Sequence, residues 1–177
     1  MRLKVSSLVI FIMICFSVVG CTQSNKINEN QIGKELRNVL SMPDKIVIHY
    51  EGNIQELDKT NSQFKKIVEL TNSRFHNKLT TAKDIIDDKV MESTYKDGLG
   101  IEFIYNNEQS LSIKEDGFQP FKYYKLYFLL TSKLYGNSQG STVHIVQYGD
   151  KEHYKDCSRG PLKYSEELIE TIHNLEF

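Results

Sequence analysis

The apolar run from Val5 to Val19 limits how the rest of the chain can fold. Serines are its only strongly polar residues, and the cations Arg2 and Lys4 precede it. A helix needs about 20 apolar residues to cross the hydrocarbon core of a bilayer. The run is therefore too short for a spanning helix and is typical of the apolar region of a signal peptide. The folded part must be built from the residues that follow it.

A cysteine follows this run directly after a glycine. The sequence Val18-Val19-Gly20-Cys21 has the order aliphatic, aliphatic, small, cysteine, and the polar residues 22–25 come next. This N-terminal segment resembles the lipobox signal peptide of bacterial lipoproteins. The resemblance implies cleavage between Gly20 and Cys21 and a diacylglycerol cysteine with acyl chains such as palmitate. In the alternative interpretation, the segment stays uncleaved as a simple anchor and Cys21 has no role.

A lipid on Cys21 would define where the protein works. Each buried CH₂ group of an acyl chain contributes about 0.8 kcal/mol, and two chains give stable anchoring. The resemblance thus implies a location at the extracytoplasmic face of the cell membrane, with the membrane and the lipoprotein-processing enzymes as partners. It divides the chain into a signal peptide (1–20), a flexible tether (21–30) and a single globular domain (31–177).

The cysteines constrain how the domain is stabilised. Cys15 lies in the apolar run and would be removed with it, and Cys21 would be acylated. Cys157 then has no partner for a disulfide, although such bonds form readily outside the cytoplasm. The hydrophobic core alone must therefore stabilise the domain, and a chain of 177 residues is long enough to bury one.

The charge of the chain excludes one class of partner. The chain has 22 basic and 23 acidic residues, for a formal net charge of −1. A protein that binds nucleic acid needs a basic surface to neutralise the phosphates. We therefore expect no nucleic acid among the partners.

Apolar residues at helical spacing predict several helices. The spacing i, i+4, i+7, i+8 marks residues 28–40. A similar stripe marks residues 62–74, behind the sequence Thr60-x-x-Gln63, which has the form of a capping box. Ser165 and the acidic residues after it predict the start of a helix over 165–175.

Runs of β-branched and aromatic residues between turn signals predict the strands. Residues 45–57 have the pattern of a hairpin, and residues 90–95 and 99–105 are expected to form another around the turn signal Asp97-Gly98. Further strands are expected at 110–113 after the turn Asn106-Asn107, at 123–131, at 142–148 and around His153-Tyr154. Together these elements predict an α+β fold: a single domain with a mostly antiparallel sheet and helices packed on one face.

The histidines and the remaining cysteine form no recognised catalytic or metal motif. His153 and Cys157 are four residues apart, and His144 would supply a third zinc ligand if the fold brought the three together. Cys157 is also a candidate activated thiol, because the cation of Arg159 would lower its pKa. The preferred interpretation is a strand end with an unpaired cysteine. We therefore predict no catalytic, cofactor-binding or metal-binding residue.

Carboxylate pairs supply no catalytic set in this sequence. The pairs Asp87-Asp88, Glu115-Asp116 and Glu166-Glu167 are adjacent in the chain, so their side chains point apart on a strand or a helix. A glycosidase instead aims two carboxylates from separate elements at one bond. These pairs indicate solvated turns and a helix start.

An aromatic segment is the least ordinary feature of the domain. Aromatic residues and lysines are interleaved over residues 118–128. Strict alternation would place Tyr123, Lys125 and Tyr127 on one face of a strand, and tyrosine is favoured at interfaces. The simpler interpretation is a strand with one buried face. As a binding surface, this segment has Tyr123 and Tyr127 as its candidate residues.

Loose patterns in the domain suggest a relationship but no activity. They are Pro43-Asp44-Lys45-Ile46, residues 101–105, residues 124–131 and Gly160-Pro161-Leu162. In these the chain resembles small lipoproteins of unknown function from low-GC Gram-positive bacteria. We expect a membrane-anchored, non-enzymatic interaction or accessory domain with an envelope protein as its partner. The alternatives are a cell-envelope hydrolase and a small-ligand-binding lipoprotein.

Overall fold

The computed structural model describes residues 39–75, 80–82, 88–111, 113, 119–132 and 145–176. The described elements are β1 (Lys45–Tyr50), β2 (Asn53–Leu57), α3 (Phe64–Ser73), β3 (Thr80–Ala82), α4 (Asp88–Asp97), β4 (Gly98–Leu111), β5 (Phe121–Ser132), β6 (Val146–Gly149), β7 (Tyr154–Gly160) and α5 (Glu166–His173). The predicted signal peptide, the tether and all but the end of the helix expected at 28–40 lie outside the described residues, so those predictions stay untested.

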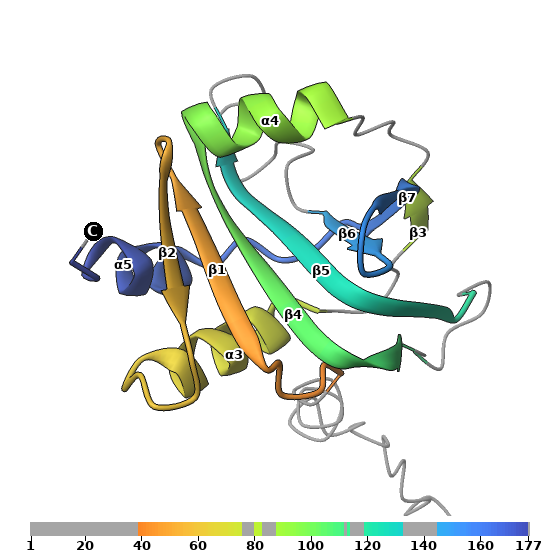
Figure 1. Cartoon of the computed structure of the whole chain (residues 1–177), viewed down its shortest axis with the longest axis horizontal. Helices are drawn as coiled ribbons and strands as arrows, with labels where there is room; N and C mark the ends of the chain where they lie inside the picture. The colour runs from red at the N-terminus through yellow and green to blue at the C-terminus, as the bar shows by residue number, and fades with distance from the viewer. Residues whose placement is uncertain are drawn as a thin grey trace, which may run out of the picture.

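The described strands form one sheet. Its order is β2-β1-β4-β5-β6-β7-β3, and all neighbouring strands run antiparallel (Figure 1). The long strands β4 and β5 lie at its centre. This confirms the α+β fold class with a mostly antiparallel sheet.

The hairpin expected at 45–57 is confirmed, and its turn explains the pairing. Ile46 pairs with Leu57 and Tyr50 pairs with Asn53, so only Glu51 and Gly52 connect the strands. Their φ angles are 46° and 84°. Positive φ at both central residues is the signature of the type I′ turn, whose twist matches that of the strands.

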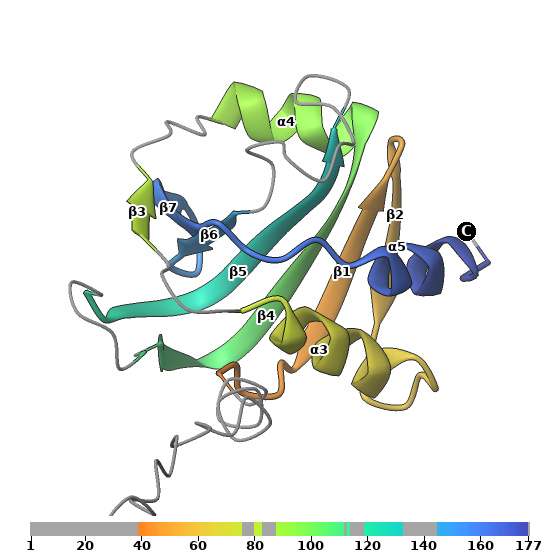
Figure 2. The ribbon, with the colours of Figure 1, turned by 180° about the vertical axis from the view of Figure 1, so that it is seen from behind.

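The helices α3 and α5 cover one face of the sheet, here called the inner face (Figure 2). Ile67 of α3 and Leu168 of α5 are fully buried in the main core. The Ser165 hydroxyl accepts a hydrogen bond of 3.3 Å from the Leu168 N–H, which confirms the predicted N-cap. The predicted capping box is wrong, because α3 begins after Gln63 with no side-chain cap.

The main core lies between the inner face and these helices. It is built from aliphatic and aromatic side chains of β1, β4 and β5, all of them fully buried. These residues are Ile46, Ile48, Leu99, Ile101, Phe103, Leu126 and Phe128. Their alternation along each strand leaves the opposite, outer face for other side chains.

The helix α4 replaces the strand that the sequence predicts at 90–95. Met91 and Tyr95 lie four residues apart, which brings them to one side of a helix, and both pack with Tyr127 and Leu129. Tyr127 and Leu129 alternate with the inner-face residues of β5, so α4 covers the outer face. Asp97-Gly98 is consequently the junction of α4 and β4 rather than a hairpin turn.

The turn expected at Asn106-Asn107 is also wrong, since both residues lie within β4.

An irregularity in the sheet corrects the prediction for the aromatic segment. The pairing of β4 with β5 shifts register between Ile104 and Gln109. Both Tyr123 and Leu126 belong to the main core, whereas Tyr127 belongs to the outer-face cluster. Tyr123 and Tyr127 therefore lie on opposite faces, and only 1% and 2% of their surfaces are exposed. The prediction of an exposed binding surface at these two residues is wrong.

Candidate functional site

The outer face holds a group of polar side chains around Glu102 in the centre of the sheet. Glu102 pairs with Val47 on one side and with Tyr127 on the other, which places it in the middle of a cross-strand row. His49 of β1 and Tyr154 of β7 reach it from neighbouring positions. We call His49, Glu102, Tyr127 and Tyr154 the Glu102 cluster.

Contacts within the Glu102 cluster hold the carboxylate in place. The Tyr154 hydroxyl donates to Glu102 Oε1 in a short hydrogen bond. His49 Nε2 lies 3.6 Å from Glu102 Oε2, an ion-pair distance that exceeds the usual hydrogen-bond length. The imidazole stacks on the Tyr95 ring with 4.1 Å between centroids. The side chains of His49 and Glu102 are only 8% and 14% exposed.

The electrostatics of the cluster keep Glu102 charged at neutral pH. Burial by itself raises the pKa of the Glu102 carboxyl, but the nearby His49 ring and the hydrogen bond from Tyr154 outweigh it and lower the pKa below its usual 4.5. Burial also raises the pKa of Tyr127 and of Tyr154 well above 10, and the charge of Glu102 adds to this. Both phenols therefore keep their protons, and Tyr154 remains a donor to the carboxylate.

Two members of the cluster carry polar atoms without hydrogen-bond partners. These atoms are the Tyr127 hydroxyl and both ring nitrogens of His49, all fully buried. The Tyr127 phenol lies over Gly100, where any side chain on β4 would overlap it. The absence of a Cβ at Gly100 thus makes room for a tyrosine in the sheet's outer layer.

A pocket of about 330 Å³ opens beside Glu102. Its lining comes from β4, β5 and the turn between β6 and β7, and consists of Glu102, Ile104, Tyr105, Asn106, Tyr124, Lys125, Asp150 and Lys151. The lining mixes two carboxylates, two ammonium groups, an amide and aromatic surface.

The segment before β1 supports the pocket's β4 wall. The Tyr105 hydroxyl donates to the Ser41 carbonyl at 3.0 Å. The Asp44 N–H donates to the Ile104 carbonyl at 2.8 Å, and the Asn106 N–H donates to Asp44 Oδ2 at 2.8 Å. These bonds attach residues 41–44 to the part of β4 where the register shifts.

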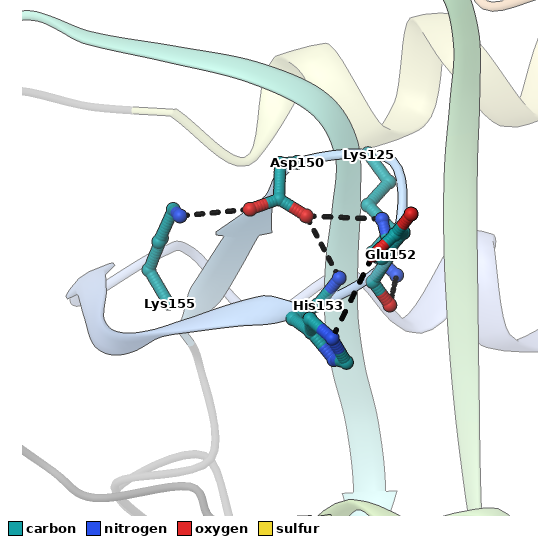
Figure 3. Close-up of polar contacts among 5 residues, drawn as sticks. All are labelled: Lys125, Asp150, Glu152, His153 and Lys155. Carbon is teal, nitrogen blue, oxygen red and sulfur yellow. Dashed lines mark hydrogen bonds and ion pairs between the residues drawn. The ribbon is translucent and has the colours of Figure 1, made fainter.

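Lys125 is held at the side of the pocket by two contacts. Its ammonium donates to the Glu152 carbonyl at 3.0 Å (Figure 3). It also lies 4.5 Å from the centre of the Tyr154 ring. Its Cε lies 2.9 Å from where a Cβ on Gly149 would be. The absence of a side chain at Gly149 therefore lets the lysine stem cross β6.

Asp150 organises the turn between β6 and β7. One carboxylate oxygen accepts the N–H groups of Glu152 and His153 at 2.9 and 2.8 Å, and the other pairs with the Lys155 ammonium at 2.8 Å (Figure 3). The backbone N–H of His153 and the cation of Lys155 hold the pKa of Asp150 far below its usual 3.8. Asp150 is therefore a structural carboxylate whose acceptor positions are largely occupied.

Lys151 extends from the same turn over an aromatic side chain. Its ammonium lies 5.0 Å from the centre of the Tyr124 ring. Lys151 is exposed and Tyr124 is half-buried. Within the described part of the chain, neither Lys125 nor Lys151 pairs with a carboxylate. The pocket thus has two cations that are not neutralised by direct partners.

The structure does not bring the predicted metal residues together. His153 precedes β7 and Cys157 lies within it, so four residue steps along extended chain separate their Cα atoms by roughly 13 Å. His153 is 79% exposed and has Glu152 as its neighbour at 3.9 Å. The third candidate ligand, His144, lies outside the described residues. Among the residues that are described, no three His, Cys, Asp or Glu side chains are placed to hold a metal ion.

Cys157 contacts a tyrosine. Its Sγ lies 2.7 Å from the Tyr148 hydroxyl, within hydrogen-bond distance. Burial, followed by this bond, raises the pKa of Tyr148. The Arg159 guanidinium, which the sequence suggests as an activator of the thiol, lies 5.1 and 5.3 Å from the centres of the Phe121 and Tyr148 rings. These contacts do not test the alternative of an activated thiol, so the predicted absence of a catalytic role for Cys157 stays a prediction.

His49 and Glu102 are site residues that were not predicted from the sequence. Their signal is weak but visible, because a glutamate lies between Ile101 and Phe103 in a strand whose neighbours are apolar. A charged residue in the middle of a central strand usually needs a partner. The identity of that partner depends on the pairing of β1 with β4, which no local pattern specifies.

Comparison with known proteins adds no assignment. Neither family models, nor curated proteins, nor solved structures give a match to this chain. Among the described helices, none is long and apolar enough to cross a membrane.

Proposed function

We propose that this protein is a lipid-anchored binding protein at the extracytoplasmic face of the cell membrane. The resemblance of residues 1–21 to a lipobox signal peptide, with Cys21 as the lipidated residue, supports the location. The observation that carries the binding role is the pocket beside Glu102, whose charged side chains are held in place before any ligand arrives. Such a preorganised site lowers the cost of ordering side chains on binding.

The charge states in the pocket favour binding over hydrolysis. Glu102 and Asp150 come from separate elements and line one pocket, which is the arrangement that a glycosidase requires. A glycosidase also needs one carboxyl with a raised pKa to protonate the leaving group. The pKa values of Glu102 and Asp150 are both lowered, so neither carboxyl keeps a proton to donate near neutral pH.

The lipid anchor predicts a specific labelling result. In cells fed a fatty-acid probe, the wild-type chain should carry the label and the Cys21→Ala variant should lose it entirely, because the thiol is the point of attachment. The Cys157→Ala variant serves as the matched control and should label as the wild type does. Labelling of Cys21→Ala at the wild-type level would contradict the anchor.

The binding role predicts stabilisation without chemical change. The purified full chain in detergent should unfold several degrees higher with a soluble fraction of the cell envelope, because a ligand at 100 times its Kd stabilises the folded state by about 2.7 kcal/mol. The mass spectrum of that fraction should stay the same after incubation. New cleavage products that depend on the protein would show an enzyme instead.

A further inference from the structure

We propose that the pocket beside Glu102 binds a small zwitterion, with its anionic group at Lys125 and Lys151 and its ammonium group at Glu102. This inference rests on the proposed binding function and names the class of ligand. It is argued from the charges that remain available in the pocket, from its size and from the acceptor capacity of Glu102.

The charges left after internal pairing are of both signs. Asp150 is occupied by Lys155 and by two backbone N–H groups, so it contributes little to a ligand. Lys125 and Lys151 lack carboxylate partners within the described residues, and Glu102 is ionised. The Glu102 carboxylate would repel a ligand that carries only negative charge. The two ammonium groups would repel a ligand that carries only positive charge.

Glu102 has room for one more donor. Its Oε1 accepts from Tyr154, while Oε2 has His49 at 3.6 Å, beyond the usual length of a hydrogen bond. A carboxylate can accept about four hydrogen bonds. Because Glu102 lines the pocket, an ammonium group there would have an acceptor whose position is already set.

The two lysines can receive an anion, Lys125 at the side of the pocket and Lys151 at its rim. Lys125 is fixed by Glu152 and by the Tyr154 ring. Lys151 lies at the exposed rim over Tyr124. Both ammonium groups keep donors free, since an ammonium carries three and Lys125 uses one in its bond to the Glu152 carbonyl. A carboxylate or a phosphate would satisfy these donors.

The size of the pocket restricts the ligand to a small molecule. Its volume of about 330 Å³ is at the lower end of the range, about 300–1,000 Å³, that is usual for small-molecule sites. Two sources share the required chemistry: an amino acid, whose anion is a carboxylate, and a phosphoethanolamine group, whose anion is a phosphate.

Titration calorimetry on the full chain in detergent tests the ligand class with matched probes. Alanine carries both charges, propionate is alanine without the ammonium, and ethylamine is alanine without the carboxylate. O-phosphoethanolamine tests the phosphate source. We expect alanine or O-phosphoethanolamine to bind at least tenfold more tightly than propionate or ethylamine. Equal binding of a singly charged probe, or no binding of either zwitterion, would overturn the inference.

Variants then assign the contacts. Glu102→Gln and Lys151→Gln should each weaken binding of the zwitterion about tenfold, because each removes a charge-assisted hydrogen bond. Lys151 is exposed, so its variant should fold even if Glu102→Gln does not. Lys163→Gln, an exposed lysine outside the pocket, is the control and should bind as the wild type does. Unchanged affinity in Lys151→Gln would overturn the inference.

The two proposals fail in different ways. If no zwitterion binds while the envelope fraction still raises the unfolding temperature, the ligand class is wrong and the binding function stands. If neither the probes nor the envelope fraction has an effect, both are wrong.

Discussion

Glu102 carries its charge at a position that is largely closed to water. Burying a carboxylate is costly unless other groups compensate the lost hydration. Here Tyr154 donates a hydrogen bond and His49 lies within ion-pair distance, and together they lower the pKa despite the burial. Glu102, the central residue of the candidate site, is thus a buried carboxylate that Tyr154 and His49 keep ionised.

Glu102 should contribute to the loss of stability in acid. Its pKa in the folded protein is lowered from 4.5, so the unfolded chain binds its proton at a higher pH than the folded chain. The carboxylate therefore stabilises the fold above about pH 4.5, and this contribution disappears as the pH falls to the folded pKa.

The Glu102→Gln variant should reveal this contribution in urea unfolding. We expect a loss of about 1–2 kcal/mol at pH 7, from the hydrogen bond of Tyr154 to a charged acceptor. The difference from wild type should shrink below pH 4. The control Glu170→Gln changes an exposed glutamate of α5 and should follow the wild-type curve. A difference that stays constant with pH would contradict the role given to the charge.

The elements differ in how far their own sequences determine them. Four elements follow from the spacing of their own apolar residues and agree with the predictions. They are the β1–β2 hairpin, the helices α3 and α5, and the central strand β5. The segment of α4 has too few apolar residues for its pattern to distinguish helix from strand. Its contact with Tyr127 and Leu129 comes from tertiary structure, and such contacts routinely override local preference.

The hairpin turn offers a prediction at this scale. Glu51 adopts a φ of 46°, which is unfavourable for most residues but tolerated by asparagine. Glu51→Asn should therefore stabilise the protein by about 0.5–1 kcal/mol in urea unfolding. Gly52→Ala, at a φ of 84°, should destabilise it. Destabilisation by Glu51→Asn would show that the glutamate side chain makes a contact worth more than the turn conformation.

For the whole molecule, the fold class was predictable and the site was not. Alternating strands and turn signals are local properties, so they indicated a mostly antiparallel sheet. The Glu102 cluster joins side chains from β1, β4, β5 and β7, and its assembly depends on strand order and register. The burial of Tyr123 and Tyr127 on opposite faces depends in turn on a register shift between β4 and β5. Strand order and register shifts leave no periodic pattern of apolar residues within a single segment, so the sequence does not predict them.

The attachment of residues 41–44 to β4 also has a mechanical consequence. A pull on the N-terminal side of the chain would load the hydrogen bond of Leu40 to Asn72 in α3 and then the bonds of Ser41 and Asp44 to β4. The β4 partners are Ile104, Tyr105 and Asn106. These three residues line the pocket. Tension would thus reach the wall of the site as well as α3, so force on this segment and occupancy of the site would be coupled.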